Sequence, residues 1–163
     1  MSLPAHYAVT EGVLAGAYPG TAEGVRALER SGVTVFVDLT HPSDPLPGYD
    51  RWLDGTRRIA HPIPDMGTPT AGHVIQILDD IDAVRAEGGT VYVHCWGGIG
   101  RTGTVVGCVL ADQGLDYDAV IDRLGLLRRG TRKEDRAAPE MRVQHDLIRR
   151  RADNHAVRHT EAQ

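Results

Sequence analysis

The 163-residue sequence predicts an α/β fold in which a mainly parallel central sheet is flanked by helices. Two observations predict it. Short β-branched, apolar runs that suit buried parallel strands alternate along the chain with longer runs that suit helices. In addition, a glycine-rich loop at 94–103, HCWGGIGRTG, joins one of these strands to a buried helix. Ligands of such sheets bind beyond the carboxyl ends of the strands, so this junction is the first candidate for a site.

Three strands and one helix are predicted in the first 63 residues. The strands are residues 13–18, 33–39 and 57–63, and the third is the weakest because it ends at prolines. Between the first two strands, Thr21 is the expected N-cap of a helix that runs to about Ser31.

The remaining sequence continues the alternation of strands and helices. Thr68 is the expected N-cap of a helix with one apolar face. Residues 90–93 form the next strand and residues 104–110 a buried helix. Further helices are expected over about 116–129 and 139–151. The residues expected to face the core from these helices are Val74, Ile77, Leu78, Ile81, Val84, Val120, Leu124, Leu127, Met141, Leu147 and Ile148.

Length and composition predict one domain over residues 1–153, followed by a polar C-terminal tail, 154–163. No apolar stretch approaches the ~18 residues of a membrane span, and the N-terminus lacks the layout of a signal peptide. Two cysteines make no disulfide framework, which suits a reducing compartment. We therefore expect a cytoplasmic monomer with no membrane partner.

The charge of the chain, −4 in total, is unevenly distributed. Residues 1–122 contain 7 basic and 16 acidic side chains, whereas residues 123–163 contain 11 and 6. The basic third would suit acidic partners. The alternative, which we favour, is that the arginines at 128–129 and 149–151 are solvated helix ends, where cations suit the helix dipole. Because the chain is acidic overall and only 5% aromatic, no nucleic-acid partner is expected.

The loop between Cys95 and Arg101 has the composition of a phosphate-binding site. At the start of a helix the first backbone N–H groups lack partners, and the helix dipole favours an anion there. Glycines can take positive φ, so that successive N–H groups turn inward around tetrahedral oxygens. The Arg101 guanidinium can grip two such oxygens at once. The expected phosphate-binding residues are Trp96, Gly97, Gly98, Ile99, Gly100 and Arg101, and the three glycines among them can take positive φ.

Cys95 lies where the helix terminus and Arg101 concentrate positive charge. Such surroundings favour the thiolate form, and a thiolate beside a bound phosphate is a nucleophile for phosphorus. The alternative is a buried structural cysteine in a glycine turn. A nucleotide-binding P-loop is excluded, because that motif needs a lysine after its last glycine and the only lysine of this chain is Lys133.

The pattern of His94-Cys95, five residues, then Arg101-Thr102-Gly103 resembles the active-site loop of the cysteine-based protein tyrosine phosphatase superfamily. The resemblance covers about residues 13–150 and is greatest to the dual-specificity-like group, in particular its small bacterial members. Gly97 departs from the pattern, because the family commonly has alanine there. The resemblance implies a protein tyrosine phosphatase-like fold and a phosphatase that hydrolyses phosphomonoesters through a phosphocysteine intermediate.

That mechanism needs no metal and no other cofactor, because Arg101, the loop amides and the helix terminus supply the positive charge. His155 and His159 have the i, i+4 spacing of metal ligands, but they lie in the polar tail without a companion cysteine. No metal site is therefore expected.

A leaving alkoxide or phenoxide requires a proton from a nearby acid. Asp65, within the run IPDMGTP at 63–69, resembles the acid of the family, with Ile63 in place of the tryptophan of phosphotyrosine-specific enzymes. The alternative for Asp65 is an ordinary turn aspartate. Asp38, Asp44 and Asp50 are weaker candidates for the acid.

Supporting roles are expected for three further residues. The hydroxyl of Thr102 would stabilise the departing thiolate. Gln144 resembles the family's water-positioning glutamine and its helical spacing turns it inward, the alternative being an amide packed at a helix contact. His94 would hold the loop backbone and tune the thiol, the alternative being an ordinary strand-end histidine. Cys108 falls on the apolar face of the buried helix and is expected to pack in the core.

Phosphorylated proteins are the expected substrates, with phosphotyrosine first and phosphoserine or phosphothreonine next. The loop lacks the lysines of phosphoinositide-directed relatives, and no aromatic segment deepens the pocket. The loop 41–49 would form one wall, with Tyr49 or Trp52 either stacking on substrate or packing within the loop. The alternatives are a catalytically weak phosphoprotein-binding module and a phosphatase of RNA 5′-phosphates or small phosphometabolites.

Overall fold

A five-stranded sheet in the order β1-β2-β5-β3-β4 forms the centre of the computed structural model, which describes residues 4–131 and 133–161. The pairs β2·β5, β5·β3 and β3·β4 are parallel, and only β1·β2 is antiparallel. The strands are β1 (His6–Thr10), β2 (Val13–Gly16), β3 (Val35–Asp38), β4 (Arg57–Ala60) and β5 (Val91–His94). The α-helices are α1 (Ala22–Arg30), α2 (Ala71–Ala86), α3 (Gly100–Asp112), α4 (Tyr117–Leu127) and α5 (Arg142–Glu161), and η1 (Asp50–Trp52) is a short 3-10 helix.

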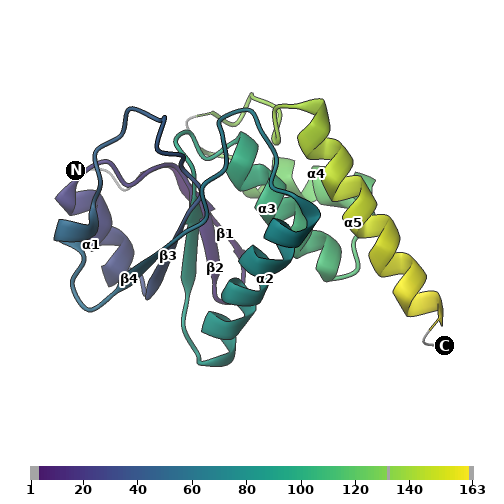
Figure 1. The fold of residues 1–163 in the computed structure, drawn as a ribbon, viewed down its shortest axis with the longest axis horizontal. Helices are drawn as coiled ribbons and strands as arrows, with labels where there is room; N and C mark the ends of the chain where they lie inside the picture. The colour runs from purple at the N-terminus through teal and green to yellow at the C-terminus, as the bar shows by residue number, and fades with distance from the viewer. Residues whose placement is uncertain (1–3, 132, 162–163) are drawn as a thin grey trace.

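The central strands are buried on both faces, and their side chains alternate between two hydrophobic cores. In β3, Val35 and Val37 belong to the larger core, whereas Phe36 belongs to the smaller one. Helix α1 covers the smaller core on one side of the sheet, and α2, α3, α4 and α5 lie on the opposite side (Figure 1). The predicted α/β fold with a mainly parallel sheet is confirmed.

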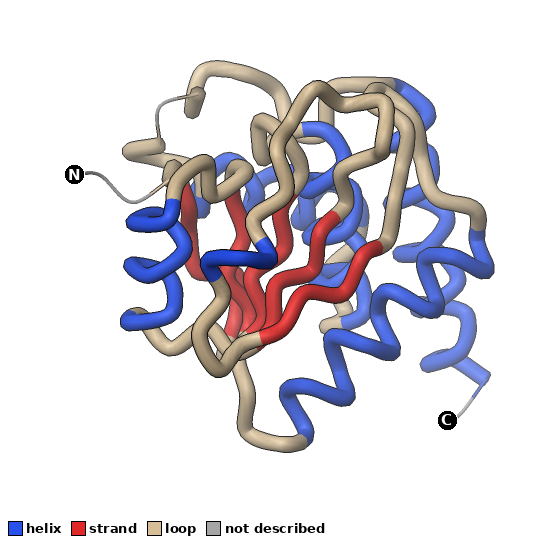
Figure 2. Tube along the Cα trace, turned by 60° about the vertical axis from the view of Figure 1, so that its left-hand side comes forward, coloured by secondary structure: helices blue, strands red, loops and turns tan. Residues whose placement is uncertain are grey.

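The register of the parallel strands aligns their carboxyl ends. His94 at the end of β5 is paired with Gly16 of β2 and with Asp38 of β3, which is itself paired with Ala60 of β4. The loops that follow these strands therefore leave the sheet at one edge, and they lie together above it in Figure 2. Asp38 and His94 lie at this edge, Cys95 directly follows it, and Asp65 lies in the loop after β4.

Two predictions for the N-terminal half need correction. Strand β1 was not predicted, although burial alternates along it; it forms an edge strand paired antiparallel with β2. The N-cap of α2 is Thr70, whose Oγ1 accepts a hydrogen bond from the His73 amide at 3.1 Å, and not Thr68. The five apolar residues predicted to face the core from α2 are all buried.

In the C-terminal half, α5 is longer than the sequence predicts and continues to Glu161, so the described part of the expected tail is helical. The rings of His155 and His159 stack there with centroids 4.2 Å apart. Met141 precedes α5 and is exposed, whereas Leu147 and Ile148 face the core as predicted. Asp116 caps α4 as its N-cap, and Val120 and Leu124 are buried.

Helix α3 is the buried centre of the helical layer, because all residues from Gly100 to Ala111 are buried. A Cβ placed on Gly107 would lie 2.4 Å from Cδ1 of Ile148 in α5, so the absence of a side chain lets the two helices approach closely. Cys108 is fully buried beside this contact, and burial raises the pKa of its thiol to about 12. Cys108 therefore packs in the core, as predicted.

We predict that Gly107→Ala lowers the free energy of unfolding by about 1–3 kcal/mol, because the added methyl group overpacks the α3·α5 contact. Combined with Ile148→Ala, the same change should become neutral or stabilising, since alanine is favoured over glycine within a helix by about 1 kcal/mol. Urea unfolding of the four proteins of this double-mutant cycle tests the contact. An equal cost of Gly107→Ala in both backgrounds would contradict it.

Candidate active site

The loop from Cys95 to Ile99 joins β5 to α3, with the Cys95 side chain at its base. Cys95 is buried, and its Sγ accepts a hydrogen bond from the backbone amide of Gly98 at 3.2 Å. No side chain caps the start of α3 at Ile99. The first amides of α3 therefore remain available to an anion above the sulfur.

Backbone packing against β2 holds the loop in this shape. Gly98 has φ of 76°, and a Cβ on it would lie 2.5 Å from the carbonyl carbon of Gly16. The Tyr18 amide donates to the Trp96 carbonyl at 3.1 Å on the same side. Of the three loop glycines, only Gly98 adopts positive φ. Gly100 is needed for space instead, since a Cβ there would lie 3.1 Å from Gln144 Nε2.

His94 supports the loop from beneath, as predicted. Its Nδ1 lies 3.0 Å from the carbonyl oxygen of Cys95, and its Nε2 lies 2.7 Å from the hydroxyl of Tyr49. Complete burial lowers the pKa of His94, against the opposing effect of Asp38. The ring is therefore neutral, with Nδ1–H donating to the carbonyl and Nε2 accepting from Tyr49.

Tyr49 and Trp52 do not form a wall for substrate. Tyr49 is buried beneath the site, where its ring packs on Phe36 with centroids 5.6 Å apart. Trp52 is half-buried against the smaller core, and the guanidinium of Arg51 lies 4.7 Å from its ring centroid. The loop-packing alternative is therefore correct for both aromatic residues.

Arg101 lies in the first turn of α3 and is only 2% exposed. Its Nη1 donates to Oδ2 of Asp44 at 2.7 Å and to the carbonyl of Ile63 at 2.9 Å. Its Nη2 lies 3.4 Å from Oδ1 of Asp65, and its buried Nε has no partner among the described residues. Nη1 thus anchors the guanidinium. The edge formed by Nε and Nη2 keeps N–H groups that can donate hydrogen bonds to a ligand.

The two carboxylates that meet at Arg101 differ in environment. Burial would raise the pKa of Asp44, but hydrogen bonds from Arg101 and from the His41 amide outweigh it and lower the pKa. Asp44 is therefore held as a carboxylate and has no proton to give to a leaving group. The side chain of Asp65 is 52% exposed and stands at the surface of the loop between β4 and α2. Of the two, only Asp65 is accessible to a leaving group.

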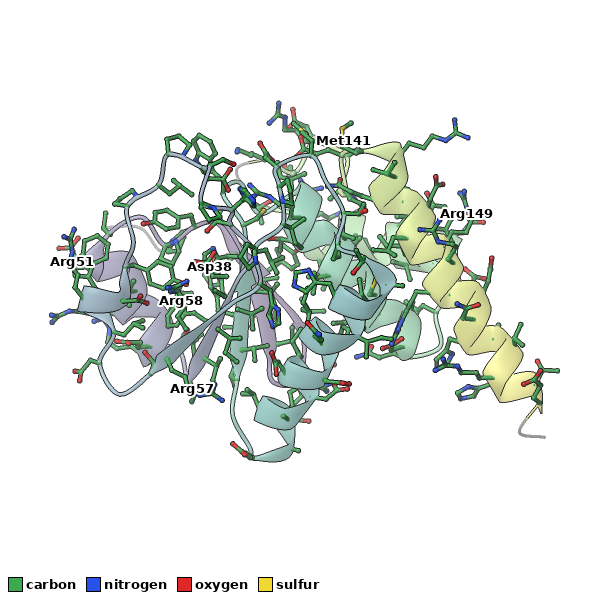
Figure 3. The ribbon with its side chains drawn as sticks, viewed as in Figure 1. Asp38, Arg51, Arg57, Arg58, Met141 and Arg149 are labelled. Atoms are coloured by element: carbon green, nitrogen blue, oxygen red, sulfur yellow. The ribbon has the colours of Figure 1, made fainter. Side chains whose placement is uncertain are left out.

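The other weak acid candidates are committed to structural contacts. Arg58 forms ion pairs with Asp38 at 3.3 Å and with Asp50 at 2.7 Å. Figure 3 shows Asp38 and Arg58 next to each other on the side of the sheet that carries α1. The hydrogen bond from Arg58 lowers the pKa of Asp50, so this residue also stays ionised.

Gln144 connects the start of α5 to the loop that carries Asp65. It is fully buried, as its spacing predicts, and its Nε2 donates to the carbonyl of Gly67 at 3.0 Å. Its Oε1 accepts from the amides of Glu140 and Met141 at 3.1 and 2.9 Å. Thr102 is also fully buried, but its Oγ1 has no hydrogen-bond partner in the described chain, so the predicted contact with the Cys95 sulfur is not formed here.

Residues 4–131 and 133–161 contain no group of three or more His, Cys, Asp or Glu side chains arranged to hold a metal ion. None of the helices in this part of the chain is both long and apolar enough to cross a bilayer.

The site combines a buried thiol, an amide-lined loop, an anchored arginine and an exposed carboxylate at the carboxyl edge of a parallel sheet. These are the features of a cysteine-based phosphatase domain. Residues 7–162 match the family described as PTP-SAK, Swiss Army Knife protein, DSP-PTPase phosphatase domain. The chain belongs to this family.

Curated relatives agree with this assignment. A putative tyrosine phosphatase, 067L, of Invertebrate iridescent virus 3 is 36% identical over 115 residues, which cover 66% of this chain and 45% of the viral protein. Human dual specificity protein phosphatase 15 is 29% identical over 125 residues, or 74% of this chain and 40% of that protein. The chain spans less than half the length of these relatives.

Two crystal structures show the same fold. Tk-PTP in its active form has a TM-score of 0.75 at 24% identity, with 93% of this chain and 99% of that chain covered. Kinase associated phosphatase (KAP) has a TM-score of 0.77 at 18% identity, with 96% and 98% covered. At these identities, the likeness establishes the fold.

We predict that Asp44→Asn lowers the free energy of unfolding at pH 7 by about 1–3 kcal/mol, because Arg101 loses its charged partner. Folding lowers the pKa of Asp44, so its stabilising effect is complete above the unfolded pKa of about 3.9. The effect is lost as the pH falls from there through the folded pKa. Urea unfolding between pH 7 and pH 2 should show the variant and the wild type converging in acid. Asp153→Asn, an exposed change on α5, is the control.

Proposed function

We propose that this chain hydrolyses phosphomonoesters, phosphotyrosine among them, through a phosphocysteine intermediate on Cys95. One observation carries the proposal. The Gly98 amide donates to the Cys95 sulfur from within the loop, and the first amides of α3 have no side-chain cap, so donors are available where the phosphorus would be attacked. Donors arranged in advance around developing charge are the main source of catalysis in such sites.

In the first step, the Cys95 sulfur attacks phosphorus while the bond from phosphorus to the ester oxygen breaks. The Nε and Nη2 edge of Arg101 takes two phosphoryl oxygens, because its Nη1 is already held by Asp44 and the Ile63 carbonyl. Asp65 gives its proton to the departing oxygen. The exposure of this carboxyl and its proximity to Arg101 support that role.

In the second step, water attacks the phosphocysteine, Asp65 takes a proton from it, and the sulfur leaves as a thiolate. The buried hydroxyl of Thr102, which has no partner among the described residues, can turn to donate to that thiolate. Gln144 is a positioning residue for this step, because its Nε2 holds the acid loop at Gly67 and lies beside Gly100 of the phosphate loop. None of these roles requires a metal ion.

The names of the relatives support phosphorylated proteins as substrates. Phosphotyrosine is the first expected target, followed by phosphoserine or phosphothreonine. The absence of a stacking wall at Tyr49 is consistent with an open site that accepts more than one side chain. A second candidate, a small phosphorylated metabolite, is favoured by a cavity that borders the phosphate loop.

We predict that Cys95→Ser abolishes hydrolysis of p-nitrophenyl phosphate, because a serine hydroxyl is a far weaker nucleophile than a thiolate. The assay is run in EDTA, where the wild type should keep its full rate. Cys108→Ser is the matched control, since this second thiol is buried in the core. Turnover that survives in Cys95→Ser, or wild-type turnover that stops in EDTA, would refute the mechanism.

Asp65→Asn should lower kcat/KM by about 10²–10³-fold for O-phosphotyrosine and by much less for p-nitrophenyl phosphate. The reason is that nitrophenolate can leave without a proton, whereas the tyrosine phenoxide cannot. The alkaline fall in the pH profile of the wild type should also flatten in the variant. Equal losses on both substrates would move the role of the acid to another residue, and Asp153→Asn again serves as the control.

A further inference from the structure

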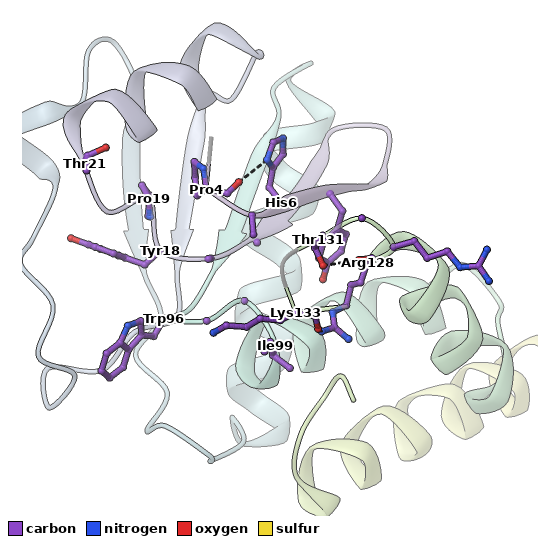
Figure 4. A pocket seen from close by; sticks show the side chains of 18 residues that line it. Pro4, His6, Tyr18, Pro19, Thr21, Trp96, Ile99, Arg128, Thr131 and Lys133 are labelled. Carbon is purple, nitrogen blue, oxygen red and sulfur yellow. Dashed lines mark hydrogen bonds between the residues drawn. The ribbon is translucent and has the colours of Figure 1, made fainter. Parts of the chain in front are cut away.

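A cavity of about 820 Å³ borders the phosphate loop and contains none of the proposed catalytic side chains. One wall is the loop segment from Trp96 to Ile99 (Figure 4). The other walls are residues 4–7, the chain after β2 at 16–19, and the turn that follows α4. Pockets of about 300–1,000 Å³ hold small molecules, so the volume suits a metabolite.

The lining of the cavity is basic although the chain as a whole has a net charge of −4. Its charged or titratable lining residues are His6, Arg128, Arg129 and Lys133 with the phenols of Tyr7 and Tyr18, and none of the described lining residues is Asp or Glu. Lys133 Nζ lies only 3.1 Å from the position of a Cβ on Gly97. The only lysine of the chain is therefore placed directly against the phosphate loop.

Arg128 builds the turn that presents Lys133. It is 4% exposed, against the prediction of a solvated helix end, and it donates to the carbonyls of Lys133 and Arg136, both at 2.6 Å. Within the same turn, the Thr131 hydroxyl donates a hydrogen bond to the Arg128 carbonyl at 2.6 Å. In the described residues, no carboxylate pairs with Arg128. Its charge is thus fixed beside the cavity and is not neutralised there.

No acidic side chain opposes these cations among the described lining residues. A basic cavity of this kind is suited to an anion.

We propose, on the basis of the function proposed above, that this cavity binds a second phosphate group of the substrate. The preferred substrate would then be a small molecule with two phosphates, one above Cys95 and the other on Lys133 and Arg129. Gly97 is two positions after Cys95 in the chain, so their Cα atoms lie within about 7 Å of each other. A bisphosphorylated sugar or polyol can span the two positions, and the volume of the cavity suits such a molecule better than a phosphopeptide with an acidic neighbour.

Fructose 1,6-bisphosphate and fructose 6-phosphate are a matched pair of probes for the second phosphate. The ratio of their kcat/KM values should favour the bisphosphate by about tenfold in the wild type, as expected for one charge-assisted contact. Lys133→Gln should remove most of that preference, and Arg129→Gln should reduce it. Arg150→Gln, which removes an exposed cation of α5 outside the cavity, is the control and should leave the ratio unchanged.

A direct measurement of binding complements the kinetics. Fructose 1,6-bisphosphate should inhibit hydrolysis of p-nitrophenyl phosphate at about tenfold lower concentration than fructose 6-phosphate, and Lys133→Gln should remove this difference. Thermal unfolding checks that the variants are folded.

The outcomes separate the two proposals. A wild-type ratio near one, or a ratio that Lys133→Gln leaves unchanged, overturns the second-phosphate site while the phosphatase mechanism stands. If Lys133→Gln lowers kcat/KM only for a phosphotyrosine peptide with an acidic neighbour, the second-phosphate site is overturned in favour of a protein substrate. Turnover that does not depend on Cys95 would instead overturn the proposed function, and with it the inference.

Discussion

The alignment of strand ends in the parallel sheet is the constraint on which the site depends. Because His94 is level with Gly16 and Asp38, the loops after β2, β3 and β5 leave the sheet at the same height. The loop after β4 joins them through the pairing of Asp38 with Ala60. Four segments that are distant in sequence are thereby held around one sulfur atom, and none of them could adopt its position alone.

The two carboxylates that the aligned strands bring to Arg101 have different roles. Asp44 and the Ile63 carbonyl hold one nitrogen of the guanidinium, which orients the remaining edge without consuming it. Asp65 stands at a longer distance and remains exposed. A buried charge is tolerated only when it is paired, so Asp44 makes it possible for Arg101 to lie within the fold and still face a phosphate.

Local charge in the cavity beside the phosphate loop is opposite in sign to the net charge of the chain. The acidic side chains of the first 122 residues largely avoid the cavity beside the loop, and the turn after α4 brings Arg128, Arg129 and Lys133 to it. The uneven distribution of charge along the sequence thus becomes a basic surface next to the phosphate loop. His94 contributes differently, because burial keeps its ring neutral and makes it a rigid support.

The sequence by itself determined the α/β class, most helices, the strand-loop-helix unit around Cys95 and the inward face of Gln144, because periodicity and capping are local properties. It did not determine strand β1, which forms by pairing with β2. It also did not determine the extension of α5 or the cap at Thr70, where adjacent residues offer alternatives of similar local preference. Only the tertiary structure decided that Asp44 anchors Arg101, that Tyr49 supports His94, and that Lys133 lies at Gly97. Each of these contacts joins residues more than thirty positions apart, and sequence patterns carry no distance information across such separations.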